Sequence, residues 1–277
     1  MTRRRAHPLR LACAVFAAAC SMLPLWWAGV SALRPSAEIF RYLSPLRLWT
    51  LIPRHLTFDN VVLLWHGSFA RAMLNSGLVV VVTLVVGLGL CALAAFGLAA
   101  LRFRGQSAVF AAVVVSFLIP FDSIAVPLAD LFRGMNLQNS YAGLIMPGLG
   151  NGLAVFLLRQ FFLSMPRELS EAAKVDGLGW FGIFWRIYLP LSRPALISAG
   201  LSLFVFQWQS YLWPLLIAPD PDYRVVSVAI ADLAGQYDVD CGQMFAGTLF
   251  EALLPMLVLL VFQRYFTASI ASSGSKE

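Results

Sequence analysis

Five consecutive polar or aromatic residues interrupt a long apolar run in the second half of the chain. They are Gln207, Trp208, Gln209, Ser210 and Tyr211. Two amides and an indole offer neutral hydrogen-bonding groups and a stacking face, which suit the hydroxyl groups of a sugar. Because lipid cannot satisfy polar groups, such side chains are expected to face the interior of a membrane protein and to line a solute path. Alternatively, Tyr211 and Trp213 belong to an interfacial aromatic belt, and the two glutamines bridge helices.

Glu251 is the single carboxylate in the last apolar run. It lies about eight residues into that run, or roughly 12 Å at 1.5 Å per residue. An ionisable group at that depth is costly and is a functional hypothesis by default. We expect Glu251 inside the helix bundle, either as a residue of the solute path or as a helix-bridging or protonated carboxyl group.

Residues 167–194 form the longest charged segment, and it separates two apolar runs. Its charged side chains are Arg167, Glu168, Glu171, Lys174, Asp176, Arg186 and Arg193. At roughly 2.5 to 3.5 kcal/mol each, moving them to mid-bilayer would cost on the order of 20 kcal/mol. The segment is therefore predicted to lie in water.

The same segment has a helical pattern with a break. Good helix formers precede Asp176–Gly177, and Pro190 and Pro194 are expected to stop a helix. After the break, aromatic residues recur at a spacing close to 3.6, namely Phe181, Phe184, Trp185 and Tyr188. We predict two helices joined at Gly177, the second with one aromatic face that packs on the membrane helices or on a partner.

Composition indicates an integral membrane protein. Hydrophobic residues make up 60% of the chain and charged residues 12%, half the share usual in soluble domains. The net charge of +6 does not indicate nucleic acid, because Lys and Arg flank apolar runs instead of forming a stripe. The apolar runs predict six transmembrane helices, over residues 11–33, 71–101, 106–129, 139–158, 195–217 and 244–262.

The other segments follow from these spans. Residues 1–10 are predicted to be a cytosolic N-terminus, 34–70 an extracytoplasmic segment, 219–243 a polar outer loop and 267–277 a disordered tail. Prolines near residue 120 predict a broken third span. Small residues in the second run, Gly87 and Ala95 among them, predict close helix packing. Most Lys and Arg residues then fall on the side of residues 167–194, which makes that side cytosolic and places both termini there.

The charged segment resembles a known family. The order Glu-Ala-Ala, Asp-Gly and Leu-Pro-Leu-Ser-Arg-Pro is similar to the EAA loop of permease subunits of binding-protein-dependent ABC importers, especially those of the carbohydrate-uptake branch that take up maltose or glycerol 3-phosphate. Residues 159–162, Arg-Gln-Phe-Phe, resemble the family as well. In that family the loop is a coupling helix that docks in an ATPase subunit. The resemblance assigns docking to Glu171, Ala172, Ala173, Asp176, Gly177 and Pro190.

The resemblance implies a type I importer permease fold, with one transmembrane domain over residues 1–277 and a core bundle over 71–266, in a bacterial inner membrane. Its partners would be a second, similar permease subunit, a dimer of ATP-binding subunits, an extracytoplasmic solute-binding protein and membrane lipid. ATP and Mg²⁺ would be bound by the ATPase and no cofactor by this chain. Trp208-Gln209-Ser210 departs from the family's Trp-Asn pattern, so the resemblance does not assign a particular solute to this chain.

Other functions have weaker support. A secondary transporter or channel should carry ionisable relay residues in several spans, and only Glu251 qualifies. An integral membrane enzyme would need a catalytic set, and neither H-E-x-x-H nor G-x-S-x-G occurs. The glycines at 177, 179 and 182 match G-x-G-x-x-G but follow a predicted helix instead of a strand, so nucleotide binding is rejected. Scattered Cys and His residues give no metal-ligand spacing. A glycerol-phosphate solute would be favoured by an intramembrane cation that binds its phosphate, and the sequence offers none.

Overall fold

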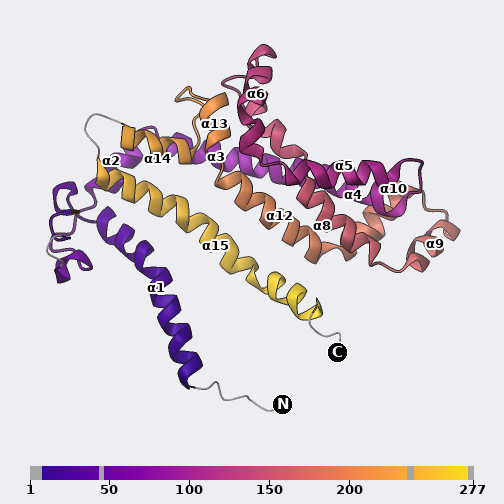
Figure 1. The fold of residues 1–277 in the computed structure, drawn as a ribbon, viewed down its shortest axis with the longest axis horizontal. Helices are drawn as coiled ribbons and strands as arrows, with labels where there is room; N and C mark the ends of the chain where they lie inside the picture. Colours follow the sequence, from indigo (N-terminus) through magenta and orange to yellow (C-terminus); the bar gives the residue numbers. More distant parts are fainter. Residues whose placement is uncertain (1–7, 44–46, 236–239, 274–277) are drawn as a thin grey trace. The chain divides into compact units, whose positions relative to one another are not determined.

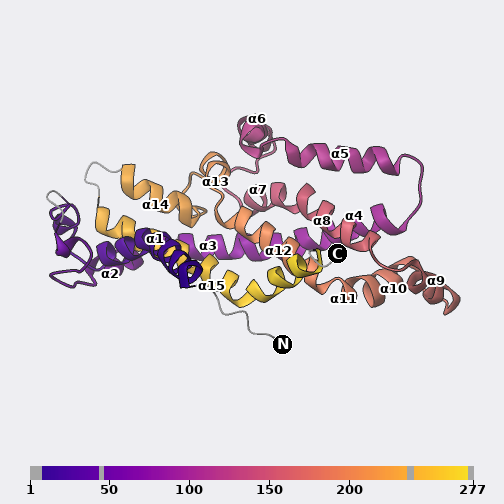
Figure 2. The same ribbon diagram turned by 60° about the horizontal axis from the view of Figure 1, so that its bottom comes forward.

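The computed structural model describes residues 8–43, 47–235 and 240–273. Within these ranges the regular structure is helical and no strand occurs, which confirms the all-α prediction. Figures 1 and 2 show these helices in two orientations. Of the predicted N-terminus and tail, residues 1–7 and 274–277 lie outside the described ranges.

Four helical runs are long and apolar enough to cross a bilayer, over Leu11–Ala32, Phe69–Ala100, Tyr141–Leu163 and Cys241–Phe262. Each holds at least the ~20 residues that a span of about 30 Å needs. They are built from α1 (Pro8–Ala32), then α3 (Phe69–Val82), η3 (Thr83–Gly87) and α4 (Leu88–Ala100), then α7 (Tyr141–Ile145), η4 (Met146–Leu149) and α8 (Gly152–Leu163), and finally α15 (Cys241–Ser273). They correspond to the predicted first, second, fourth and sixth spans.

Two further apolar pairs are bent and make six spans if each counts as one. Helices α5 (Gln106–Leu118) and α6 (Phe121–Gly134) meet at 98°, so the third span is broken near residue 120, as expected. Pro120 causes the turn, because it has an extended backbone with ψ 125° and no N–H to donate.

The fifth span is also shorter than predicted. Helix α12 (Arg193–Trp208) ends where Ser210 N donates to Gln207 O, and α13 (Leu212–Ile217) starts separately. A continuous helix over 195–217 is therefore wrong, because Tyr211, with φ −122° and ψ −56°, is not helical. Pro190 lies in α11 (Leu189–Leu191), one residue before the helical run Trp180–Leu191 ends, as predicted, and this run meets α12 at 80°. Pro194 does not stop a helix, because it lies in the first turn of α12, where a missing N–H costs nothing.

Two predicted irregular segments contain helix. The loop 219–243 holds the apolar helix α14 (Val226–Gly235), whose Val226 and Val228 are buried; a wholly polar loop is wrong, since the aspartates at 220 and 222 precede the helix. The tail is helical as far as Ser273, so disorder over 267–273 is wrong as well. Its Ala, Ser and Ile residues simply continue α15.

The contacts divide the chain into two compact units. The first unit joins Met1–Ala70 to Ala229–Leu254, and the second joins Arg71–Val228 to Pro255–Glu277. The predicted assignment of one transmembrane domain to the whole chain stays a prediction.

In the first unit, a buried arginine organises the segment after α1. Arg34 is 1% exposed, and its Nε and Nη2 donate to the carbonyl oxygens of Val30 and Thr50. Asn60 Nδ2 donates to Ala32 O and Arg34 O, which fixes the start of α2 (Asp59–His66). The described residues of 34–43 and 47–68 thus fold as short helical pieces, among them η1 (Ser36–Glu38) and η2 (Leu48–Thr50), too broken to span, as predicted.

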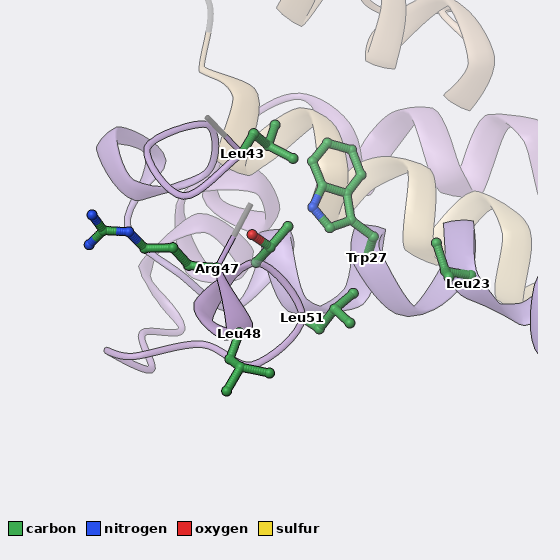
Figure 3. A pocket seen from close by; sticks show the side chains of 7 residues that line it. Leu23, Trp27, Leu43, Arg47, Leu48 and Leu51 are labelled. Atoms are coloured by element: carbon green, nitrogen blue, oxygen red, sulfur yellow. The ribbon is translucent and has the colours of Figure 1, made fainter. Parts of the chain in front are cut away.

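A pocket of ≈ 660 Å³ opens beside η2 in the same unit. Figure 3 shows its lining, which consists of Leu23, Trp27, Leu43, Arg47, Leu48, Thr50 and Leu51. Leucines make up most of the wall, and the Arg47 side chain extends away from Trp27. A wall this apolar offers few hydrogen-bond partners for the hydroxyl groups of a solute.

In the second unit, α4 packs between α8 and α12. Its small buried residues Cys91, Ala92 and Ala95 face the buried Ala154 and Leu158 of α8 in one core cluster. Small side chains let the helix axes approach closely, as predicted for this run. In both views α9 (Arg167–Val175) and α10 (Trp180–Ile183) lie at one end of this unit, and α6 and α13 lie toward the other (Figures 1 and 2).

Candidate functional site

The predicted two-helix loop is present, and a glycine makes its corner. Gly177 has φ +83°, a left-handed conformation that strains any residue with a side chain. Gly177 N donates to Lys174 O and Leu178 N donates to Ala173 O. These two bonds form a Schellman motif, which satisfies the last carbonyl groups of α9 and turns the chain toward α10.

The motif residues divide between the surface and the core. Glu171, Ala172, Asp176 and Gly177 are exposed, and so is Val175, at 88%. Ala173 is buried at 4% within the core cluster of the second unit. Glu168, Glu171, Ala172 and Val175 share one helix face at i, i+3, i+4 spacing, so α9 offers a partner one mixed acidic and apolar strip. Of the predicted docking residues, Ala173 faces inward and anchors the helix.

After the corner, the four aromatic residues do not share one face. Phe184 and Tyr188 are buried, whereas Phe181 and Trp185 are 69% and 52% exposed. The single aromatic face is therefore wrong, because residues Phe184–Tyr188 form a π-helical turn, η5, that rotates the side chains away from a 3.6-residue repeat. Exposed Pro190 follows η5 in α11 and lies outside the strip on α9.

Four aromatic rings surround Phe96 of α4, and all but that of Trp180 are buried. Its centroid lies 4.9 Å from that of Tyr188, 5.2 Å from Phe184, 6.3 Å from Trp180 and 6.4 Å from Phe162. We call these five residues the Phe96 cluster. Lys174 Nζ of α9 lies 3.8 Å from the Trp180 ring centroid, a cation–π contact. Sequence reasoning missed Phe96 and Trp180, since no spacing rule joins a residue of the second run to the charged loop.

The six candidate residues of the solute path do not form one surface. Gln207 and Trp208 are buried in the last turn of α12, and Trp208 stacks on Phe204. Gln209 and Tyr211 are exposed in the break after α12, and Ser210 O accepts a hydrogen bond from Ser227 Oγ. Glu251 is half-buried on α15 in the first unit. Trp213 is not an interfacial belt residue, because it is 3% exposed and its Nε1 donates to Gly143 O.

Gln207 instead belongs to a close contact inside the second unit. A Cβ placed on Gly148 of η4 would lie 2.7 Å from Gln207 Oε1 and 2.9 Å from Thr83 Cγ2, so these groups close on a bare glycine. A Cβ on Gly87 would lie 3.2 Å from Leu149 Cα. The η3 turn of one run thus touches the η4 break of the other. We call Thr83, Gly87, Gly148, Leu149 and Gln207 the Gly148 crossing.

Among the described residues, no group of three or more His, Cys, Asp or Glu side chains is placed to hold a metal ion. The fold and the site define a multi-pass helical membrane protein with an exposed two-helix loop between two apolar segments.

Comparison with known proteins gives the family. The family model described as binding-protein-dependent transport system inner membrane component matches residues 87–272. The chain belongs to this family, as its charged loop predicted. It is the membrane-spanning permease subunit of a binding-protein-dependent ABC importer, in an inner membrane.

Relatives cover nearly the whole chain. The arabinooligosaccharides transport system permease protein AraQ of Bacillus subtilis is 29% identical over 96% of this chain and 96% of its own length. The sn-glycerol-3-phosphate transport system permease protein UgpE of Yersinia pestis is 29% identical over 91% of each chain. A crystal structure of a bacterial ABC transporter that imports the acidic polysaccharide alginate has a TM-score of 0.80 at 20% identity, over 96% of this chain and 99% of that one. That likeness shows the importer permease fold.

Proposed function

We propose that this permease carries a sugar whose hydroxyl groups are recognised without a charged side chain, and that α9 receives the driving force from a separate ATPase. The observation behind the second statement is the exposed strip on α9, which projects at one end of the second unit and is fixed at its corner by Gly177.

The solute class is argued from the buried polar groups. In the described part of the second unit, the fully buried polar side chains are Asn75, Ser76, Thr83, Ser192 and Gln207. All are neutral, and amides and hydroxyls match sugar hydroxyls in donors and acceptors. A phosphate would need a cation to offset its desolvation. AraQ is named for arabino-oligosaccharides, which supports a sugar, and UgpE for glycerol 3-phosphate, which keeps that solute as the second candidate.

The proposed subunit assembly is the one that the family resemblance of the charged loop implies. ATP and Mg²⁺ are bound by a dimer of ATPase subunits in the cytosol, one of which takes α9 in a surface cleft. A second, similar permease subunit completes the path, and an extracytoplasmic binding protein delivers the solute. Basic residues concentrate on the side of α9, so both termini are cytosolic. Closure of the ATPases shifts the permease between inward-facing and outward-facing states by their differential binding to α9.

The solute is tested by reconstituting the permease pair, the ATPase and the binding protein in lipid nanodiscs and measuring ATP hydrolysis. An uncharged oligosaccharide should stimulate hydrolysis severalfold, and glycerol 3-phosphate should not. Stimulation by glycerol 3-phosphate alone would overturn the sugar proposal.

The docking strip is tested with Glu171→Lys. The charge reversal should lower the amount of ATPase that copurifies with the permease by about tenfold, the effect of roughly 1.4 kcal/mol of lost affinity. The control is Asp122→Lys, the same reversal on an exposed side chain of α6. Equal copurification of both variants with the ATPase would contradict docking at α9.

A further inference from the structure

The loop of residues 167–191 is held to the membrane helices without hydrogen bonds. Within the part of the chain that the structure describes, its side-chain and turn hydrogen bonds stay inside the loop or reach Ser192 at its end, as in Ser170 Oγ to Arg167 O and Ser192 N to Tyr188 O. The remaining attachment is apolar. Ala173 and Leu178 pack in the core cluster, and Trp180 contacts Phe96.

Much of this attachment meets one side chain of α4, and Tyr188 also contacts Phe162 of α8, with ring centroids 5.4 Å apart. Phe96 is 5% exposed and contacts four rings, of which Trp180, Phe184 and Tyr188 come from the loop and Phe162 from α8. Tilted and T-shaped ring pairs are attractive over a range of angles and are worth about 0.5–1.5 kcal/mol each. They can therefore roll past one another while contact persists, as a directional hydrogen bond cannot.

The opposite end of the same helical run reaches the Gly148 crossing. From Phe96 back to Gly87 is nine residues, about 14 Å along the helix axis. There Gly87 approaches the backbone of Leu149, and Cys91 Sγ lies 3.7 Å and 3.6 Å from the carbonyl oxygens of Leu149 and Asn151. If α4 is displaced, it therefore pushes on the η4 break of the neighbouring helical run and on Gln207.

Both ends of this path contain an irregular helical turn. The π-helical turns are Thr83–Gly87 and Phe184–Tyr188, one in the Gly148 crossing and one in the Phe96 cluster. A π-helical turn carries an extra residue in the i→i+5 pattern and is frequent at functional sites.

We propose that Trp180 and Phe96 form the joint through which movement of α9 enters the membrane helices, and that α4 conveys it to the Gly148 crossing. The proposal rests on the function proposed above and assigns Trp180 and Phe96 as positioning residues for coupling. They neither touch the solute nor dock the ATPase. The contact of Lys174 Nζ with the Trp180 ring ties α9 to the joint.

The test is Trp180→Ala in the reconstituted complex, with Trp185→Ala as matched control. Trp185 has the same side chain, lies in the same helical run and contacts Phe181 and Phe184 but not Phe96 among the described ring pairs. The amount of bound ATPase, ATP hydrolysis and solute uptake are measured together. For Trp180→Ala we expect wild-type ATPase binding and basal hydrolysis, and a fall of about fivefold or more in solute moved per ATP, the lower range of site-to-site coupling.

Trp180→Phe retains a ring against Phe96 and should recover most of that loss, whereas Trp185→Ala should match the wild type. Equal transport per ATP in Trp180→Ala and Trp185→Ala would overturn the joint. So would loss of bound ATPase in Trp180→Ala, since Trp180 would then act in docking. Failure of the function proposed above is distinct, because the wild-type permease would then bind no ATPase at all.

Discussion

The two ends of the second unit each place a tryptophan among aromatic rings, but they are built for different purposes. Trp213 contacts Phe121 and Phe132 at 5.8 Å and 5.2 Å, is buried, and donates its N–H to Gly143 O. Trp180 contacts Phe96 at 6.3 Å, is 40% exposed, and meets Lys174 through its ring face. Trp213 is held by a directional hydrogen bond, whereas Trp180 is held by its ring contact with Phe96 and its cation–π contact with Lys174.

Further hydrogen bonds fix the Trp213 end. Asn139 N donates to Ile217 O, and Arg133 Nη2 donates to Leu216 O, which ties α13 to α6 and the turn after it. Asn75 Nδ2 donates to Asp222 O and Arg224 O. Each such bond contributes about 1 kcal/mol and holds one geometry. The comparison favours the proposal above, in which this end serves as a frame and the loop that carries α9 moves.

The largest expected effect is at the fixed end. Gly143→Ala would place a methyl group against Leu137 O, a backbone atom that cannot move aside. We expect a loss of about 3 kcal/mol or more of folding free energy, at the upper end of overpacking. Thermal unfolding of detergent-purified protein, followed by size-exclusion chromatography, measures it.

Gly134→Ala is the control for that measurement, since nothing lies within 4 Å of its Cβ position. An equal melting temperature for Gly143→Ala and wild type would show that this end is not rigid.

A smaller effect is expected for Trp213→Phe. The ring contacts persist, but Gly143 O loses its donor in a buried place, which costs about 1–2 kcal/mol. Stability should fall while solute moved per ATP stays at the wild-type value. If the solute moved per ATP falls as much as the stability does, Trp213 acts in coupling as well, and the two ends do not differ in their roles.

The smallest effect concerns the corner of the loop. Gly177→Ala forces a side chain into φ +83°, at about 1 kcal/mol, and should weaken ATPase binding about fivefold by fraying the end of α9. Gly179→Ala is the matched control, because Gly179 has φ −72° and open space around its Cβ. Titration of the nanodisc-bound permease with ATPase measures both affinities. Equal affinities would remove Gly177 from the docking geometry.

Sequence patterns predicted the features that depend on local chemistry. The apolar runs located the helices, since a bilayer accepts little else. The charges of residues 167–194 predict that this loop lies in water, which stays a prediction. The break at Gly177 was predicted from its residue type, and the structure supplies the Schellman bonds that explain it. The predicted aromatic face failed because a 3.6-residue repeat assumes a regular helix, and η5 is a π-helical turn.

The solute-path residues show a second limit of prediction from the sequence. The polar types of residues 207–211 were read as one lining, but the end of α12 sends Gln207 inward toward Gly148 and leaves Tyr211 exposed. Residue type alone does not specify which side of a break a side chain takes. That choice depends on neighbours more than 50 positions away in the chain.

The amino-acid sequence by itself determined a helical membrane protein, a charged two-helix loop between two apolar runs and the family to which the chain belongs. Each follows from hydrophobicity, charge and a local motif, which are properties of neighbouring residues. Only the tertiary structure decided that Phe96 meets Trp180, that Gly87 and Gly148 let two runs touch at Gln207, and that one end of the second unit is fixed by hydrogen bonds. Those contacts join distant segments, and they form only because the packed helices leave each side chain a single place to be buried.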